Sequence, residues 1–245
     1  MDRIRLYHFS PFAYLILTAC GGGGGSSSQN LQFGGNIIKG PLSNATVFVD
    51  YDGDGILYSG EPSTKTDSNG AFTLTSTSST AQIVATTDAN TIDTSTGQSL
   101  AGVILKAPAG SKVVTPATTL IQETGMTSTE VADALGLTGV DLLNFNPFAA
   151  GADAATALKV EKVAQQIIAT AISISTAAES SGASSLNAIN KSFGAIADLL
   201  KNKSAASPLD FTNTADLNAI KTSAIPRQMF LFSFIFSYPS GTFSF

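Results

Sequence analysis

The spacing of apolar and polar positions changes near Thr115, and the two parts of the chain predict different elements. Before Thr115, short apolar runs alternate with polar residues, and turn signals such as 52–55 and 69–70 separate them. Short, evenly spaced strands of this kind are typical of an all-β sandwich. We expect these strands at 47–49, 71–75, 82–87 and 100–106.

From Thr115 onward the apolar positions recur with the period of a helix. Thr115 and Pro116 have the pattern of an N-cap followed by proline at the first helical position. Residues 127–130 fit a Thr-x-x-Glu capping box. Helices are expected at 155–179, 186–203 and 214–223. The predicted fold class is therefore α+β, with an N-terminal β-sandwich at 36–112 and a separate small helical bundle at 113–225.

Residues 1–19 have the layout of a secretory signal peptide. Arg3 and Arg5 precede a mostly apolar stretch at 9–19, which is too short for a bilayer span of about 20 residues. Residues 17–20, Leu-Thr-Ala-Cys, resemble the lipobox of bacterial lipoproteins. The resemblance implies cleavage before Cys20 and attachment of a lipid to its sulfur. An ordinary cleaved signal peptide with a chance cysteine, or a core helix with a free thiol, are the alternatives.

The segment that follows fits a membrane anchor. Residues 20–35 are rich in Gly and Ser and predict a flexible tether. Gly21, rather than Asp, follows the cysteine. In Gram-negative lipoproteins this residue implies passage to the outer membrane. We therefore expect a protein of the outer membrane or the cell surface that meets the membrane through the lipid on Cys20.

Composition narrows the chemistry available to the chain. Charged residues make up 13% of it, against about 25% in soluble domains, which suits a secreted or cell-surface protein. His8 is the only histidine and Cys20 the only cysteine. Removal of residues 1–19 would leave no base for Ser-His-Asp or Cys-His catalysis and no histidine for zinc. The formal net charge of -5 makes nucleic-acid binding unfavourable.

The residue composition changes after the last predicted helix. Residues 226–245 are rich in Phe, which alternates with other residues from Phe230 to Phe236. Three interpretations compete: a truncated or artefactual end, a strand that pairs with the β domain, and an outer-membrane strand. The abrupt shift in composition at Pro226 favours the first.

One loop carries a specific metal-binding pattern. The acidic residues of a twelve-residue loop match D-x-[DN]-x-[DN]-G-x5-E, with Asp50, Asp52, Asp54 and Glu61 at positions 1, 3, 5 and 12 and Gly55 at position 6. The carbonyl of Ile56 would occupy position 7, and Tyr58 stands at position 9, where a water or a backbone oxygen would serve. Because the flanks predict strands rather than helices, we expect a Ca²⁺ loop between strands. The alternative is a solvated acidic hairpin without metal.

Residues 40–55, 60–64 and 66–74 resemble the Ca²⁺-binding, prealbumin-like B-type repeats of bacterial surface adhesins. Residues 107–121 resemble the junction to a helical module in large bacterial surface proteins. The resemblance implies an immunoglobulin-like or prealbumin-like sandwich. It also implies that Asp50, Asp52, Asp54 and Glu61 bind a Ca²⁺ ion that rigidifies the domain. It implies no enzyme.

These observations favour a non-catalytic, lipid-anchored cell-envelope protein for surface adhesion or display, with a surface protein or a glycan as partner. The alternative is a glycan-binding lipoprotein of a polysaccharide-uptake system, in which Tyr51 and Tyr58 offer aromatic faces. A hydrolase that uses the paired carboxylates is a third possibility. It is disfavoured because those carboxylates are better explained as Ca²⁺ ligands.

Overall fold

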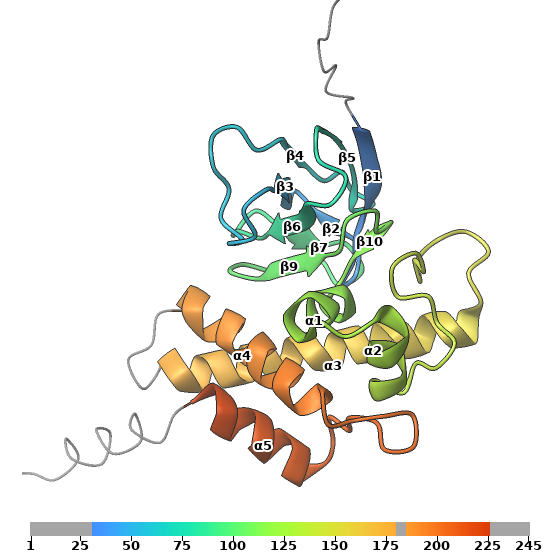
Figure 1. The fold of residues 1–245 in the computed structure, drawn as a ribbon, viewed down its shortest axis with the longest axis vertical. Coiled ribbons are helices and arrows are strands. Elements are labelled where there is room, and N and C mark those ends of the chain that lie inside the picture. The colour runs from blue at the N-terminus through green and yellow to red at the C-terminus, as the bar shows by residue number, and fades with distance from the viewer. Residues whose placement is uncertain (1–30, 180–184, 226–245) are drawn as a thin grey trace, which may run out of the picture.

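A computed structural model describes residues 31–179 and 185–225, which form a mixed α+β fold with three small sheets and five helices (Figure 1). The expected signal peptide, the lipidated Cys20 and the Phe-rich segment 226–245 lie outside the described residues. The tether was predicted to run to residue 35, whereas strand β1 begins at Leu31. Position 35 of this strand requires glycine, because a β-carbon there would lie only 2.5 Å from the Lys112 carbonyl oxygen.

The strands pair mostly in antiparallel fashion. In one sheet, β1 (Leu31–Ile37) lies between β5 (Ala71–Ser76) and, in parallel, β10 (Val113–Val114). The four-stranded sheet has the order β4 (Ser63–Lys65), β3 (Thr46–Asp50), β6 (Gln82–Thr86) and β9 (Ile104–Ala107). The third sheet contains β2 (Leu42–Ser43), β7 (Ile92–Asp93) and β8 (Gln98–Ser99).

Two of the described helices begin at the predicted caps, Thr115 and Thr127. The helices are α1 (Pro116–Thr124), α2 (Ser128–Ala134), α3 (Ala154–Glu179), α4 (Ser185–Leu200) and α5 (Thr214–Ala224). The side chain of Thr115 accepts a hydrogen bond from the Thr118 N–H, and Thr127 with Glu130 forms the expected capping box. In residues 31–179 and 185–225, no helix has both the length and the apolar character that a bilayer crossing requires.

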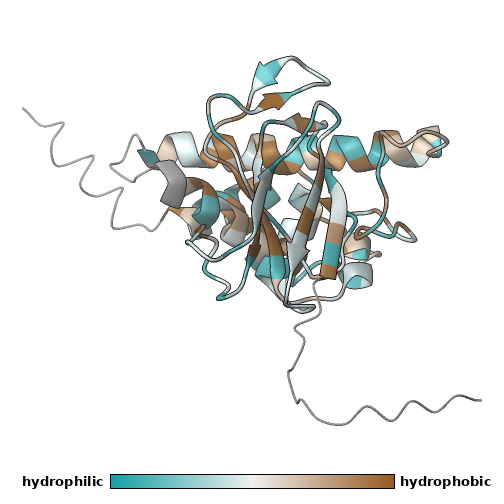
Figure 2. Ribbon diagram, turned by 90° about the horizontal axis from the view of Figure 1, so that it is seen from above, coloured by the Kyte–Doolittle hydropathy of each residue, from teal (hydrophilic) through white to brown (hydrophobic). Residues whose placement is uncertain are grey.

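Strands and helices share one continuous apolar core. Figure 1 shows α1 between β9 and the helices α3 and α4, all of which it contacts. Figure 2 shows hydrophilic and hydrophobic residues interleaved along α3, as expected of a helix with one buried face. The boundary expected at 112–113 falls directly before β10, which pairs with β1. The core therefore continues across that boundary through α1.

A buried ion pair connects the turn before β2 with strand β7. The Lys39 Nζ lies 2.7 Å from Asp93 Oδ2, and Asp93 is 1% exposed. The other oxygen of Asp93 accepts hydrogen bonds from the backbone N–H and the hydroxyl of Ser95. Burial raises the pKa of Asp93, but the hydrogen bonds from Lys39 and Ser95 and the charge of Lys39 outweigh it and hold the pKa below its ordinary value of 3.8.

We predict that Lys39→Met lowers the free energy of unfolding at pH 7 by about 3–5 kcal/mol, because it leaves the Asp93 carboxylate buried without its cation. In the wild-type protein the pair contributes fully above the ordinary pKa of 3.8 and is lost as pH falls through the lower folded-state value. The difference between variant and wild type should therefore shrink in acid. Denaturant titrations at several pH values measure it.

The control is Lys65→Met, because Lys65 and Asp88 form an exposed pair at 3.9 Å. This change should cost no more than about 1 kcal/mol. Equal losses in both variants would contradict the assigned role of the buried pair.

Candidate metal centre

Asp50 ends β3 and begins the loop that leads to β4, at the left of Figure 1. The Asp50 side chain is buried and turned back into the loop. Its Oδ1 accepts a hydrogen bond from the Gly53 N–H at 2.7 Å, and its Oδ2 accepts one from the Gly55 N–H at 2.8 Å. Gly53 and Gly55 have φ values of 84° and 79°, which glycine adopts without strain. The loop thus wraps around one carboxylate.

A neighbouring strand completes the shell around Asp50. Gln82 lies opposite Asp50 in the register of β3 and β6, and its Nε2 donates to Asp50 Oδ2 at 2.7 Å. Burial raises the pKa of Asp50, but the hydrogen bonds from Gln82, Gly53 and Gly55 outweigh burial and lower it. Asp50 is therefore held as an anion at neutral pH.

Asp52 and Asp54 are exposed on the same loop. Asp52 Oδ1 accepts from the Asp54 N–H at 3.2 Å, and Asp54 Oδ1 accepts from the Ile56 N–H at 2.7 Å. The hydrogen bond from the Asp54 N–H lowers the pKa of Asp52. Desolvation and the charges of Asp54 and Asp50 raise it by more, so the pKa of Asp52 lies above its ordinary value. Crowding of negative charge thus works against ionisation of Asp52.

One carboxylate oxygen from each of Asp50, Asp52 and Asp54 lies within 4.8 Å of the others, so this group could hold a metal ion. The donors are all oxygens, the type preferred by hard cations such as Ca²⁺ and Mg²⁺. Among the described ion pairs, none involves the acidic residues of the loop. A bound cation would therefore relieve the repulsion in the group.

Glu61, the twelfth residue of the motif, does not belong to this group. Its carboxylate oxygens accept hydrogen bonds from the backbone N–H groups of Tyr51 and Tyr58, both at 2.9 Å. Glu61 therefore closes the loop by binding its backbone. The other two expected contributors lie on the outer part of the loop, where the side chains of Ile56 and Tyr58 are 55% and 50% exposed.

Tyr58 is influenced by the acidic group. A hydrogen bond with Asp54 and the negative charge of that carboxylate raise the pKa of Tyr58. The Tyr58 carbonyl accepts from the Glu61 N–H at 3.2 Å. On the other side of the loop, the Tyr51 hydroxyl lies 3.1 Å from Ser76 Oγ. The side chains of Tyr51 and Tyr58, both on the acidic loop, remain about half exposed.

The sequence motif did not reveal the residues that support the loop from other elements. Gln82 contacts Asp50 from β6, and Gln122 of α1 in turn donates to Gln82 Oε1 at 2.7 Å. A β-carbon added at Gly55 would lie 3.6 Å from the Lys106 Cε. These contacts depend on strand pairing and helix packing, so no short-range signal in the sequence identifies them.

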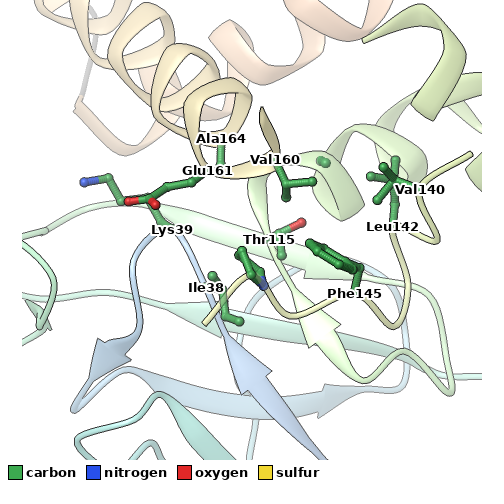
Figure 3. A pocket seen from close by; sticks show the side chains of 11 residues that line it. Ile38, Lys39, Thr115, Val140, Leu142, Phe145, Val160, Glu161 and Ala164 are labelled. Atoms are coloured by element: carbon green, nitrogen blue, oxygen red, sulfur yellow. The ribbon is translucent and has the colours of Figure 1, made fainter. Parts of the chain in front are cut away.

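A second place that could hold a ligand is a small pocket between the turn after β1, α3 and residues 140–147. Figure 3 shows Ile38, Leu142, Phe145 and Val160 around it. Its volume is about 20 Å³, which suffices for a water molecule and is far below the roughly 300–1,000 Å³ of small-molecule sites. This pocket is therefore a weaker candidate than the acidic loop.

Comparison with known proteins finds no protein-family model, no curated protein and no solved structure that matches the chain. Functional inference therefore rests on the geometry of the loop and on the sequence motifs.

In metal-free protein, Asp50→Ala should lower the free energy of unfolding by about 1–3 kcal/mol, because it leaves the Gly53 and Gly55 N–H groups and the Gln82 amide without their acceptor. Asp52→Ala should change it little or raise it, since it removes crowded negative charge. Denaturant titration in the presence of chelator measures both. A larger loss in Asp52→Ala than in Asp50→Ala would refute this division of roles.

Proposed function

We propose that the chain is a non-catalytic, lipid-anchored protein of the cell envelope whose strand-rich part is stabilised by Ca²⁺ at loop 50–61. The observation that carries the proposal is the convergence of the Asp50, Asp52 and Asp54 carboxylates within 4.8 Å. Ca²⁺ accepts six to eight oxygen ligands in flexible geometry, whereas Mg²⁺ requires a strict octahedron. A loop that offers three carboxylates and adjustable carbonyls suits the larger ion.

The remaining ligands would come from the rest of the motif. The Ile56 carbonyl would supply one oxygen, and Tyr58 would contribute through its backbone or a water. Glu61 would bind the cation only if its carboxylate released the Tyr51 and Tyr58 N–H groups. Cation binding would therefore tighten the loop by drawing Glu61 towards the three aspartates.

The finer fold assignment belongs to the same proposal. An immunoglobulin-like or prealbumin-like sandwich is supported by the antiparallel β1–β5 and β3–β6–β9 ladders, and the helices that follow β10 pack on it through the shared core. In such a domain the Ca²⁺ loop would form a rigid corner after β3. The lipid on Cys20 would hold this unit at the outer membrane or cell surface, where it serves adhesion or display.

A second candidate is glycan binding in a polysaccharide-uptake system. It is favoured by the half-exposed rings of Tyr51 and Tyr58 beside the acidic loop, since aromatic faces are common sugar platforms. A glycan-array screen of the wild-type protein and Tyr58→Ala separates the two functions. Binding that is lost in the variant would favour the uptake protein, and an empty array would favour adhesion or display to a protein partner.

Millimolar Ca²⁺ should raise the unfolding midpoint, and chelator should reverse the rise. Extracellular Ca²⁺ modules bind with dissociation constants on the order of 10⁻⁴–10⁻³ M, so about 10 mM Ca²⁺ is roughly a 10- to 100-fold excess and should add about 1.4–2.7 kcal/mol of stability. Mg²⁺ should stabilise less. Thermal melts of the wild-type protein, Asp52→Ala and the control Asp88→Ala measure the shift.

Asp88→Ala should keep the Ca²⁺ shift, because Asp88 lies outside the loop and pairs with Lys65. Asp52→Ala should lose most of it. If Ca²⁺ leaves the wild-type melting curve unchanged, the loop is an acidic turn without metal.

Cys20→Ser should abolish lipidation, because serine lacks the sulfur that accepts the lipid. The variant should accumulate as an uncleaved precursor or leave the membrane fraction, as measured by fractionation and metabolic labelling with a fatty acid. If this variant matured and fractionated like the wild-type protein, the proposed lipid anchor would be wrong.

A further inference from the structure

The acidic loop is joined to helix α1 through the side-chain amide of Gln82. Gln82 Nε2 donates to Asp50 Oδ2 at 2.7 Å, and Gln82 Oε1 accepts from Gln122 Nε2 at 2.7 Å. Asp50 belongs to the loop, Gln82 to β6 and Gln122 to α1. One amide therefore connects three segments that are distant in sequence.

The orientation of this amide follows from the charge of Asp50. An ionised carboxylate only accepts hydrogen bonds, so the NH₂ group of Gln82 must face Asp50. The oxygen of Gln82 then faces away and is the acceptor that Gln122 requires. A change in the position or charge of the Asp50 carboxylate would remove the reason for this orientation, and Gln122 would lose its partner.

A second connection runs beside the first. Lys106 of β9 forms an ion pair with Glu123 of α1 at 2.8 Å, and its Cε lies near Gly55 of the loop. The backbone N–H of Lys106 donates to Thr119 Oγ1 at 2.9 Å, and its carbonyl accepts from Thr118 Oγ1 at 2.8 Å. Helix α1 is thus fixed to the strands along its length.

We propose that loop 50–61 and helix α1 form one coupled unit, in which the Asp50–Gln82–Gln122 chain transmits the state of the loop to α1. Because α1 contacts α3 and α4, the state of the loop then reaches the helical part of the protein. The coupling is a property of these contacts and does not require a cation. The statement that Ca²⁺ binding is the event transmitted rests on the proposed function.

Hydrogen exchange of the full chain, purified in detergent, tests the coupling without metal. In chelator, Asp50→Asn should speed hydrogen exchange of the amides in 116–124 about tenfold. Residues connected by direct contacts typically show coupling energies that correspond to a change of this size. In the Gln122→Met background, which keeps side-chain size but removes the donor, Asp50→Asn should add no further change in 116–124. Gln98→Met, at an exposed glutamine of β8, is the matched background in which the tenfold effect should persist.

The outcomes separate the coupling from the cation. If Asp50→Asn alters exchange in 50–61 but leaves 116–124 unchanged, or alters 116–124 equally in the Gln122→Met background, the coupling is overturned. Amides of α5 serve as the check that each variant is folded. In a parallel arm, Ca²⁺ should slow exchange in both segments of the wild-type protein. Slowing confined to 50–61 contradicts the coupling, whereas no slowing in either segment contradicts only the proposed Ca²⁺ site.

Discussion

The structure around the acidic loop depends on the need to satisfy one buried carboxylate. Asp50 is 1% exposed, and a buried charge is tolerated only when hydrogen bonds or an opposite charge compensate its lost hydration. The compensation comes from the Gly53 and Gly55 N–H groups and from Gln82. Both glycines must turn their backbones towards Asp50, and this turn places Asp52 and Asp54 beside it.

The same constraint divides the acidic residues into two roles. Asp50 is stabilised as an anion by the protein itself, whereas Asp52 and Asp54 project their charge from the exposed side of the loop. Glu61 holds the backbone of the loop at its far end. The loop therefore brings three aspartates together and carries excess negative charge, which a hard cation would neutralise. Tyr51 and Tyr58 remain about half exposed on the same loop.

Local chemistry made part of this arrangement predictable from sequence. The capping motifs at Thr115 and Thr127 act within three residues, and both helices start there. The Asp-x-Asp-x-Asp-Gly spacing likewise places its three carboxylates together through short-range turns. Contacts between distant segments were not predictable: Gln82 reaches Asp50 across 32 positions. The glycines at 34 and 35 suggested a tether but belong to β1, where a neighbouring backbone leaves no space for a β-carbon at Gly35.

The central claim is that loop 50–61 binds a hard cation, and terbium luminescence tests it most directly. Tb³⁺ prefers the same oxygen ligands as Ca²⁺, and its emission can be excited through a nearby tyrosine. The chain contains no Trp, and Tyr58 lies on the same loop as the acidic group, where the Asp54 carboxylate raises its pKa. We expect sensitised emission that Ca²⁺ displaces, and that Asp54→Ala and the double substitution Tyr51→Phe/Tyr58→Phe each reduce strongly. Absence of emission at saturating Tb³⁺, or equal emission from Asp54→Ala, would contradict the claim.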